Sequence, residues 1–265
     1  MADRTKIILR SSITRLGWSC IVLAALSVVG SLPAQERVPL WPATPPGPER
    51  QVGPLKLLQQ PNDGLVAGRS VQRLTNVERP EIHVIFPPNE KRNGTVVVIC
   101  PGGGFKLLAM DLEGTEPAAW LRSLGVTAVI LQYRTPTADL VPDWQLPLQD
   151  VQRTLSLVRS RAKEWGVDAH RVGLLGFSAG AITSTRALVA GENRSYPGVD
   201  RADEFPCRPD FAVIVYPAHL TDASRLTLRP DVRITKAWPP VLLVQTADDP
   251  VGCENSVLLF QALKQ

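Results

Sequence analysis

The sequence predicts one α/β domain with a mostly parallel β-sheet, and three observations support that fold class. Short apolar runs rich in Val and Ile recur along the chain from residue 82 onward. Stretches with the spacing of an amphipathic helix fall between these runs. A G-x-S-x-G pentapeptide directly follows one apolar run and opens one helical stretch. The length of 265 residues, with 44% hydrophobic and 20% charged residues, suits one sizeable globular core.

The first 34 residues have the pattern of a secretory signal peptide. Four Lys or Arg side chains precede the apolar run IVLAALSVV at 21–29, and the small residues of SLPAQ at 31–35 offer a cleavage site after Ala34. The alternative is an uncleaved membrane anchor, but a span needs about 20 apolar residues and this run is shorter. We therefore expect a secreted or periplasmic protein without a stable membrane anchor after cleavage.

The basic character of the chain belongs largely to this leader. The leader holds four of the 29 Lys and Arg residues and one of the 25 Asp and Glu residues, so 25 basic and 24 acidic residues follow it. The remainder is therefore close to neutral. No cluster of Lys and Arg occurs in it, which argues against a nucleic-acid partner.

Three cysteines follow the leader, and an odd count leaves at least one free thiol. Cys100 ends an apolar run and is expected to be a buried thiol. Cys207 and Cys253 are able to pair in an exported protein, and the sequence leaves that pairing open. The spacing of the cysteines and histidines fits no metal site, so neither a metal nor another cofactor is implied.

Residues 35–70 are rich in Pro and Gly and predict an extended arm that lies on the domain, with Trp41 as its anchor. A solvated linker is the alternative. Residues 71–265 then form the domain, and 71–75 is a candidate edge strand. Because the apolar runs are short and rich in Val and Ile, we expect them to be buried, parallel, central strands. They are 82–86, 95–100, 126–133, 171–177, 211–216 and 241–246.

Helices are predicted between these strands, at 114–124, 147–165 and 179–190. The second has the clearest apolar stripe, in which Pro147 suits the first turn and Gly166 the exit. Strand–helix alternation of this kind predicts a sheet covered by helices on both faces, with sites beyond the carboxyl ends of the strands. The stripe consists of Leu148, Val151, Leu155, Val158, Ala162 and Trp165.

The pentapeptide GFSAG at 176–180 is the candidate site of a nucleophile. It follows a predicted strand and begins a predicted helix, which is the context of a nucleophile elbow with Ser178 at its tip. The N-terminus of the helix behind Ser178 favours developing negative charge. An ordinary strand-to-helix turn with small residues is the alternative.

The hexapeptide CPGGGF at 100–105 is the candidate oxyanion loop. Consecutive glycines after a buried strand allow backbone N–H groups to point at a ligand, and in acyl transfer they would face a tetrahedral oxyanion. We expect the N–H groups of Gly103, Gly104 and Ala179 to be the donors. The alternatives are a flexible turn and a phosphate loop, although no G-K-[ST] follows the glycines.

The segment TADDPVGCENS at 246–256 is the candidate acid loop. A serine hydrolase of this order carries its acid just past a late strand, after the nucleophile in the chain. Asp249 is the first candidate and Asp248 the second. An Asx-Pro turn without catalytic meaning is the alternative.

These motifs together resemble the α/β-hydrolase fold, and more narrowly the acetyl xylan esterase and related carbohydrate-esterase branch. The chain is also similar to feruloyl-esterase-like and lipase/esterase members with a GGG oxyanion loop. The resemblance runs from about Pro39 to the last residue. It is carried by VPLWP, NVERPEIHVIFPP, VVVICPGGGF, LEGTEPAAWLRSLGVTAVILQYR, PLQDVQRTLSLVRSRAKEWGVDAHRVGLLGFSAG, RPDFAVIVYP and DDPVGCENS.

The resemblance implies roles for individual residues. It implies that Ser178 is the nucleophile and Asp249 the acid, and that Arg134 and Asp150 form a structural pair that fixes the helix 147–165. One departure is Ala181, which stands where the family usually has another Gly.

A second departure concerns the general base. The resemblance implies a histidine some tens of residues beyond the acid, after one more strand, whereas this sequence reaches Gln265 within the helix that follows Asp249. We therefore expect a C-terminally incomplete domain that lacks its last strand and helix and leaves the strand 241–246 as an exposed apolar edge. The histidines present are His83 in an early strand, His170 at the amino edge of the sheet, and His219 at the carboxyl edge, where it is the alternative base.

The sequence thus predicts a secreted serine esterase that hydrolyses acetyl or similar small acyl esters of a carbohydrate such as xylan, through an acyl-enzyme on Ser178. Its partner would be a small-molecule or polysaccharide ester, and no cofactor is implied. An inactive remnant or binding-only protein without the histidine is the first alternative. A peptidase or lipase on the same fold is the second.

Overall fold

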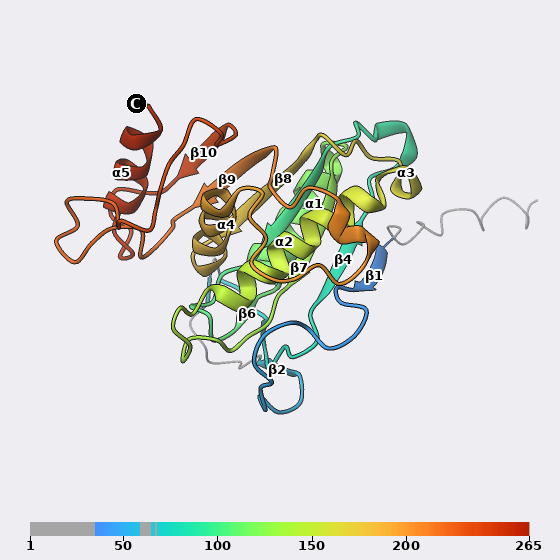
Figure 1. Ribbon diagram of the computed structural model, residues 1–265, viewed down its shortest axis with the longest axis horizontal. Coiled ribbons are helices and arrows are strands. Elements are labelled where there is room, and N and C mark those ends of the chain that lie inside the picture. The colour runs from blue at the N-terminus through green and yellow to red at the C-terminus, as the bar shows by residue number, and fades with distance from the viewer. Residues whose placement is uncertain (1–34, 59–64, 67, 265) are drawn as a thin grey trace, which may run out of the picture. The chain divides into compact units, whose positions relative to one another are not determined.

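The computed structural model describes residues 35–58, 65–66 and 68–264, and a seven-stranded sheet is its centre (Figure 1). The strand order is β1-β4-β7-β5-β8-β9-β10. The five strands from β7 to β10 pair in parallel, whereas β4 pairs antiparallel with both β1 and β7. The predicted leader, 1–34, lies outside the described residues.

The strands of this sheet follow the predicted apolar runs, with one addition. The run at 82–86 was expected to be a parallel strand, but β4 is antiparallel to its neighbours. A buried apolar pattern indicates a central strand, but it does not indicate the direction of that strand. The addition is β1, a polar stretch at the sheet edge. The bounds are β1 Gln35–Pro39, β4 Glu81–Ile85, β5 Val96–Cys100, β7 Thr127–Gln132, β8 Val172–Phe177, β9 Phe211–Val215 and β10 Val241–Val244.

A small second sheet contains three short strands in the order β2-β3-β6. They are β2 Lys56–Leu58, β3 Arg73–Thr75 and β6 Leu108–Ala109, and both pairings are antiparallel. The candidate edge strand at 71–75 is therefore present as β3, but it is the central strand of this small sheet and not an edge strand. Leu74 is buried here because β3 pairs with β6, just after the glycine loop.

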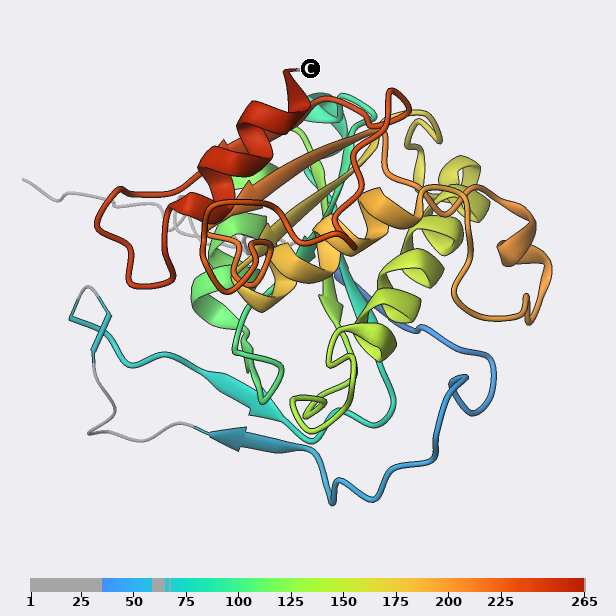
Figure 2. The ribbon, with the colours of Figure 1, turned by 60° about the vertical axis from the view of Figure 1, so that its left-hand side comes forward.

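Helices cover both faces of the main sheet. α2 and α4 pack against each other on one face, while α1 lies on the other face against β5 and β7 (Figure 2). Gly166 ends the predicted helix 147–165 in the left-handed conformation, and a break at Arg161 divides that helix in two. The bounds are α1 Glu116–Ser123, α2 Gln145–Ser160, α3 Ala162–Trp165, α4 Ala179–Ala190 and α5 Glu254–Leu263, with short helical turns at Asn89–Lys91, Asp111–Thr115 and Arg201–Glu204.

Trp41 anchors the segment between β1 and β2. Its side chain is buried and its indole Nε1–H donates to Asp150 Oδ1 at 2.9 Å, while its ring meets Tyr196 edge-on with centroids 4.8 Å apart. Arg134 donates to the same carboxylate through Nε, at 3.0 and 3.1 Å. The structural pair of Arg134 and Asp150 is thus present, with Trp41 as a third member.

The strand β10 is an exposed apolar edge of the described sheet, as expected. Leu242 is 58% exposed and Val244 is 45% exposed, and Phe260 of α5 is also exposed. Cys100, Cys207 and Cys253 are free thiols, so Cys207 and Cys253 are not paired in this structure. Within the described residues, no helix is both long enough and apolar enough to cross a bilayer.

Candidate active site

Ser178 lies at a sharp turn between β8 and α4, as the G-x-S-x-G motif predicts. Its backbone has φ 49° and ψ −115°, a conformation that is costly for a residue other than glycine. The N–H of Ser178 donates to the carbonyl of Val215 in the neighbouring strand at 3.1 Å, which holds the turn at the carboxyl edge of the sheet. The residue is partly exposed.

The elbow requires glycine at position 180 because the helix starts directly against β5. A Cβ at Gly180 would lie 1.9 Å from the carbonyl oxygen of Cys100 and 2.7 Å from that of Pro101. A real Cβ essentially never approaches a non-bonded atom to less than 3.0 Å. The missing side chain therefore allows α4 to begin beside the glycine loop and brings Ser178 to that loop.

The glycine loop supplies N–H groups without an acceptor. Among the described residues, the N–H groups of Gly103, Gly104 and Ala179 make no hydrogen bond. Ala179 directly follows the nucleophile, and the loop approaches Ser178 at Gly102. The N–H of Gly102 differs from its neighbours because it donates to Glu113 Oε2 at 2.5 Å. The pattern suits stabilisation of an oxyanion by the three free donors.

Asp249 lies in the loop between β10 and α5 and is partly buried, whereas Asp248 is exposed. Asp249 Oδ1 accepts from the N–H of Val251 at 2.8 Å, which is the Asx turn considered as an alternative in the sequence. That bond leaves Oδ2 free of a hydrogen bond among the described residues. The carboxyl group also lies within electrostatic reach of Tyr216, the residue that follows β9.

Asn255 fixes the acid loop to the segment after β9. Its Oδ1 accepts from the N–H of Leu220 at 2.8 Å, and its Nδ2 donates to the carbonyl of Gly252 at 3.0 Å. The side chain is buried. Asn255 is part of the motif DDPVGCENS, but its role depends on a partner 35 residues away and could not be derived from spacing.

None of the three histidines of the sequence hydrogen-bonds to Ser178 or Asp249 within the described structure. His83 is buried in β4, where its Nε2 lies 2.7 Å from Glu81 Oε1. His170 lies before β8, at the opposite edge of the sheet from Ser178. His219 is exposed after β9 and has a positive φ of 54°.

Two residues near the nucleophile were missed by sequence reasoning, Glu113 and Tyr216. The hydroxyl of Tyr216 makes a short hydrogen bond to Glu113 Oε1. Burial raises the pKa of Glu113, and hydrogen bonds from Tyr216 and Gly102 offset part of that effect. Burial also raises the pKa of Tyr216, and the neighbouring carboxyl groups of Glu113 and Asp249 raise it further. The motif containing LEGTEP offered the only sequence signal for Glu113.

A cavity of about 310 Å³ lies beside the first turn of α4. Ile182, which is one turn after the nucleophile, lines it together with Trp144 and His219. The guanidinium of Arg186 stacks over Trp144 at 4.8 Å from the ring centroid.

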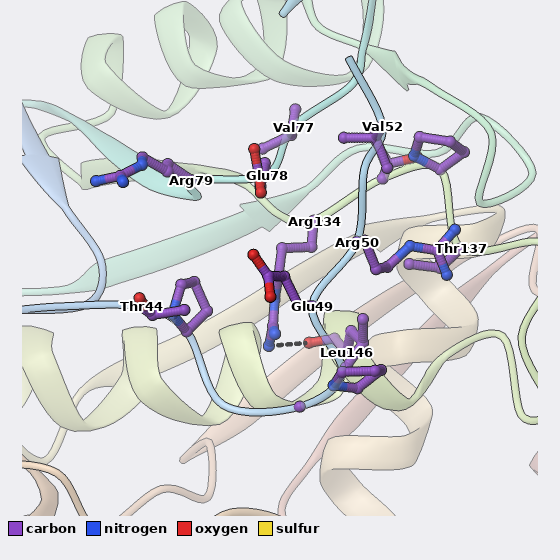
Figure 3. Close-up of a pocket in the computed structure, with 15 residues that line it drawn as sticks. Thr44, Glu49, Arg50, Val52, Val77, Glu78, Arg79, Arg134, Thr137 and Leu146 are labelled. Atoms are coloured by element: carbon purple, nitrogen blue, oxygen red, sulfur yellow. Dashed lines mark hydrogen bonds between the residues drawn. The ribbon is translucent and has the colours of Figure 1, made fainter. Parts of the chain in front are cut away.

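A second cavity, of about 280 Å³, lies between residues 44–52 and the chain that follows β7 (Figure 3). Arg134 lines it, but each nitrogen of its guanidinium already donates a hydrogen bond within the protein. Figure 3 shows the bond from Nη2 to the carbonyl of Leu146. Positive and negative side chains alternate around it, so it favours no charged ligand. They include Arg50, Arg79, Glu49 and Glu78. Neither cavity contains three or more potential metal ligands, and no such group gathers elsewhere in the described residues.

Comparison with known proteins points to esterases. A family model described as BD-FAE matches residues 82–207, a little under half of the chain. An acetylxylan esterase from Xylanibacter ruminicola is 28% identical over 155 residues, which cover 58% of this chain and 27% of that protein. An endo-1,4-beta-xylanase B from Butyrivibrio fibrisolvens is 26% identical over 188 residues, which cover 64% of this chain and 29% of that protein. The chain thus spans less than a third of the length of these two relatives.

Solved structures show the same architecture. The acetyl ester-xyloside bifunctional hydrolase from Caldicellulosiruptor lactoaceticus superimposes with a TM-score of 0.64 at 25% identity, over 89% of this chain and 83% of that one. Esterase 2 from Thermogutta terrifontis superimposes with a TM-score of 0.59 at 16% identity, over 70% and 72% of the two chains. The second likeness concerns the fold alone.

Proposed function

We propose that this chain, which has the α/β-hydrolase fold and is similar to acetylxylan esterases, is a serine esterase that removes acetyl or similar small acyl groups from a carbohydrate such as xylan. The observation that carries the proposal is the backbone of Ser178, with φ 49° and ψ −115° between β8 and α4. A strained serine at this point serves to expose its hydroxyl at the carboxyl edge of the sheet. The relatives with acetylxylan esterase and acetyl ester hydrolase activity in their names support the substrate class.

In this mechanism the hydroxyl oxygen of Ser178 attacks the ester carbonyl, and its proton passes to a general base. The N–H groups of Gly103, Gly104 and Ala179 stabilise the oxyanion of the tetrahedral intermediate. The protonated base then gives this proton to the sugar oxygen as its bond to the acyl carbon breaks, so the sugar leaves with a free hydroxyl group and the acyl group stays on Ser178. A water molecule, activated in the same way, releases the acid.

The general base has two candidates. The family resemblance implies a histidine that follows the acid in the chain and is oriented by Asp249. His219 is the alternative, because it lies after β9 at the correct edge and lines a pocket with Pro250 and Val251 of the acid loop. His219→Ala separates the two: it abolishes activity only if His219 is the base.

A binding-only protein is the second candidate function. It is favoured by one observation, the lack of a hydrogen bond from any histidine to Ser178 in the described structure. Such a protein would keep the cleft and bind an acetylated glycan without releasing acetate.

Release of acid from defined esters tests these proposals. The panel contains acetylated xylan, a peptide and a long-chain acyl ester, each with the wild-type chain and with Ser178→Ala. Acetate release from xylan by the wild type alone supports the carbohydrate esterase. Turnover of the peptide or the long-chain ester instead would support a peptidase or lipase, and binding without release would support the binding-only protein.

We also propose that the protein is exported and cleaved after Ala34. The support is the sequence pattern, in which four basic residues precede the apolar run at 21–29 and small residues precede Gln35. Intact-mass spectrometry of the exported protein would give a chain that starts at Gln35. A mass that still contains residues 1–34 would contradict cleavage.

A further inference from the structure

The carboxyl group of Glu113 joins the glycine loop to the end of β9, and the proposed triad gives it no role. Glu113 belongs to the helical turn Asp111–Thr115 and is partly buried. The N–H of Gly102 donates to its Oε2 at 2.5 Å, and the hydroxyl of Tyr216 bonds to its Oε1. One side chain thus bridges the segments that follow β5 and β9.

The same carboxyl group lies next to the nucleophile. A Cβ on Gly102 would be 2.7 Å from Glu113 Oε2 and 2.8 Å from Ser178 Cβ. Gly102 therefore lies in close contact with both the carboxyl group of Glu113 and the side chain of Ser178. A side chain at position 102 would push them apart.

Tyr216 is a rigid anchor for this contact. Its N–H donates to the carbonyl of Val244 in β10 at 2.8 Å, and the residue before it, Val215, accepts from the N–H of Ser178. Tyr216 has a positive φ of 38°, which a tyrosine adopts only when its surroundings impose it. Its hydroxyl is thereby held at a fixed place beside the elbow.

We propose that Glu113 is a positioning residue of the oxyanion hole: it holds Gly102 against the elbow so that the next two N–H groups stay directed at the reacting carbonyl. The inference rests on the proposed serine-esterase chemistry. Donors that are held in place before the reaction stabilise the oxyanion strongly, because nothing has to reorganise as charge develops. Since the N–H of Gly102 is occupied by Glu113, the donors left are those of Gly103 and Gly104.

The hydrogen bonds of Glu113 fit this role. Its Oε2 accepts from the N–H of Gly102, and its Oε1 accepts from the hydroxyl of Tyr216. A glutamine keeps an acceptor for the N–H of Gly102 and offers a donor to the oxygen of Tyr216, whereas an alanine has neither.

The test measures how fast a fluorophosphonate modifies Ser178 in the full chain, because the phosphoryl oxygen of this probe occupies the oxyanion hole. Glu113→Ala is expected to slow labelling by about tenfold or more, and Glu113→Gln to stay within about threefold of the wild type. The matched control is Glu116→Gln, three residues along, where the carboxylate pairs with Arg69 at the surface. It should label at the wild-type rate.

Circular dichroism of each variant separates slow labelling from unfolding. If Glu113→Ala does not fold, Tyr216→Phe is the test variant, because it removes only the hydroxyl that anchors Glu113. We expect Tyr216→Phe to label several-fold more slowly than the wild type. If Glu113→Ala folds and labels at the wild-type rate, the role of Glu113 is overturned while the proposed function stands. If Glu113→Ala is unfolded, a wild-type labelling rate in Tyr216→Phe has the same meaning. A wild-type chain that never labels at Ser178 would overturn the proposed function together with it.

Discussion

The indole of Trp41 donates a hydrogen bond to Asp150 at 2.9 Å although the two residues are 109 positions apart. Asp150 also accepts from the backbone N–H of Arg134 at 2.9 Å and from its guanidinium. One buried carboxylate thus connects the segment after β1, the end of β7 and the helix α2. Because α2 packs against α4, this connection supports the helix that begins at the nucleophile.

Removal of this carboxylate should destabilise the whole domain. Asp150→Ala leaves the guanidinium of Arg134 buried with its charge uncompensated, and loss of one partner of a buried ion pair costs about 3–5 kcal/mol. We expect the free energy of unfolding, measured by denaturant titration, to fall by about that amount. The control is Glu192→Gln, which breaks the exposed pair with Arg208 and should cost less than about 1 kcal/mol. Equal losses in the two variants would contradict the structural role of Asp150.

Gly180→Ala should disrupt the elbow. The new Cβ would lie 1.9 Å from the carbonyl oxygen of Cys100, which is a backbone atom and cannot rotate away, so strand and helix must separate. We expect a loss of about 1–3 kcal/mol in the free energy of unfolding, with loss of labelling at Ser178. Gly198→Ala is the control, because its Cβ would be 3.5 Å from the nearest side chain. A Gly180→Ala variant as stable and reactive as this control would show that the close approach is absent.

Glu113 should give the protein a characteristic dependence of stability on pH. Because burial raises the pKa of Glu113 in the folded state, its contribution to stability is fully present below the ordinary glutamate pKa of about 4.3 and is lost as pH rises through the raised value. Glu113→Gln cannot ionise and lacks this loss. The stability of the variant relative to the wild type should therefore increase from acid to neutral pH. A difference that does not change with pH would contradict the raised pKa.

The three cysteines should differ in reactivity with iodoacetamide. Burial raises the pKa of Cys100 to about 12 and also raises the pKa of Cys207, so little thiolate forms at either. Cys253 is partly exposed. Peptide mapping at about pH 8 should find Cys253 modified at least about tenfold faster than the other two in the native protein. Comparable rates at Cys100 would mean that the end of β5 is open to solvent.

The elbow is the part of the site that local sequence predicts best, because its chemistry depends on adjacent residues. The helix expected at 179–190 begins and ends where α4 does, and Ser178 has the strained backbone that the motif requires. β10 was also expected at its correct place, with exposure of Leu242 and Val244 as the consequence of its edge position. The direction of β4 was mistaken because side-chain burial is the same in a parallel and an antiparallel central strand.

The contacts between segments could not be predicted. In the sequence, Glu113 is one of several acidic residues near the N-terminus of a predicted helix. Its contacts with Gly102 and Tyr216 form only in the folded chain. Asn255 is similar, since its partner Leu220 follows a different strand. β1 was missed because its sequence, QERVP, is polar and only its pairing with β4 reveals a strand.

The most direct test of the account is whether Ser178 reacts as a nucleophile. The purified protein is treated with a fluorophosphonate, digested and mapped by mass spectrometry, with Ser178→Ala treated in parallel. We expect one modified serine, at position 178, and no modification in the alanine variant. A wild-type chain that stays unmodified at Ser178, or that reacts equally at other serines, would contradict the assignment of this elbow as the active site.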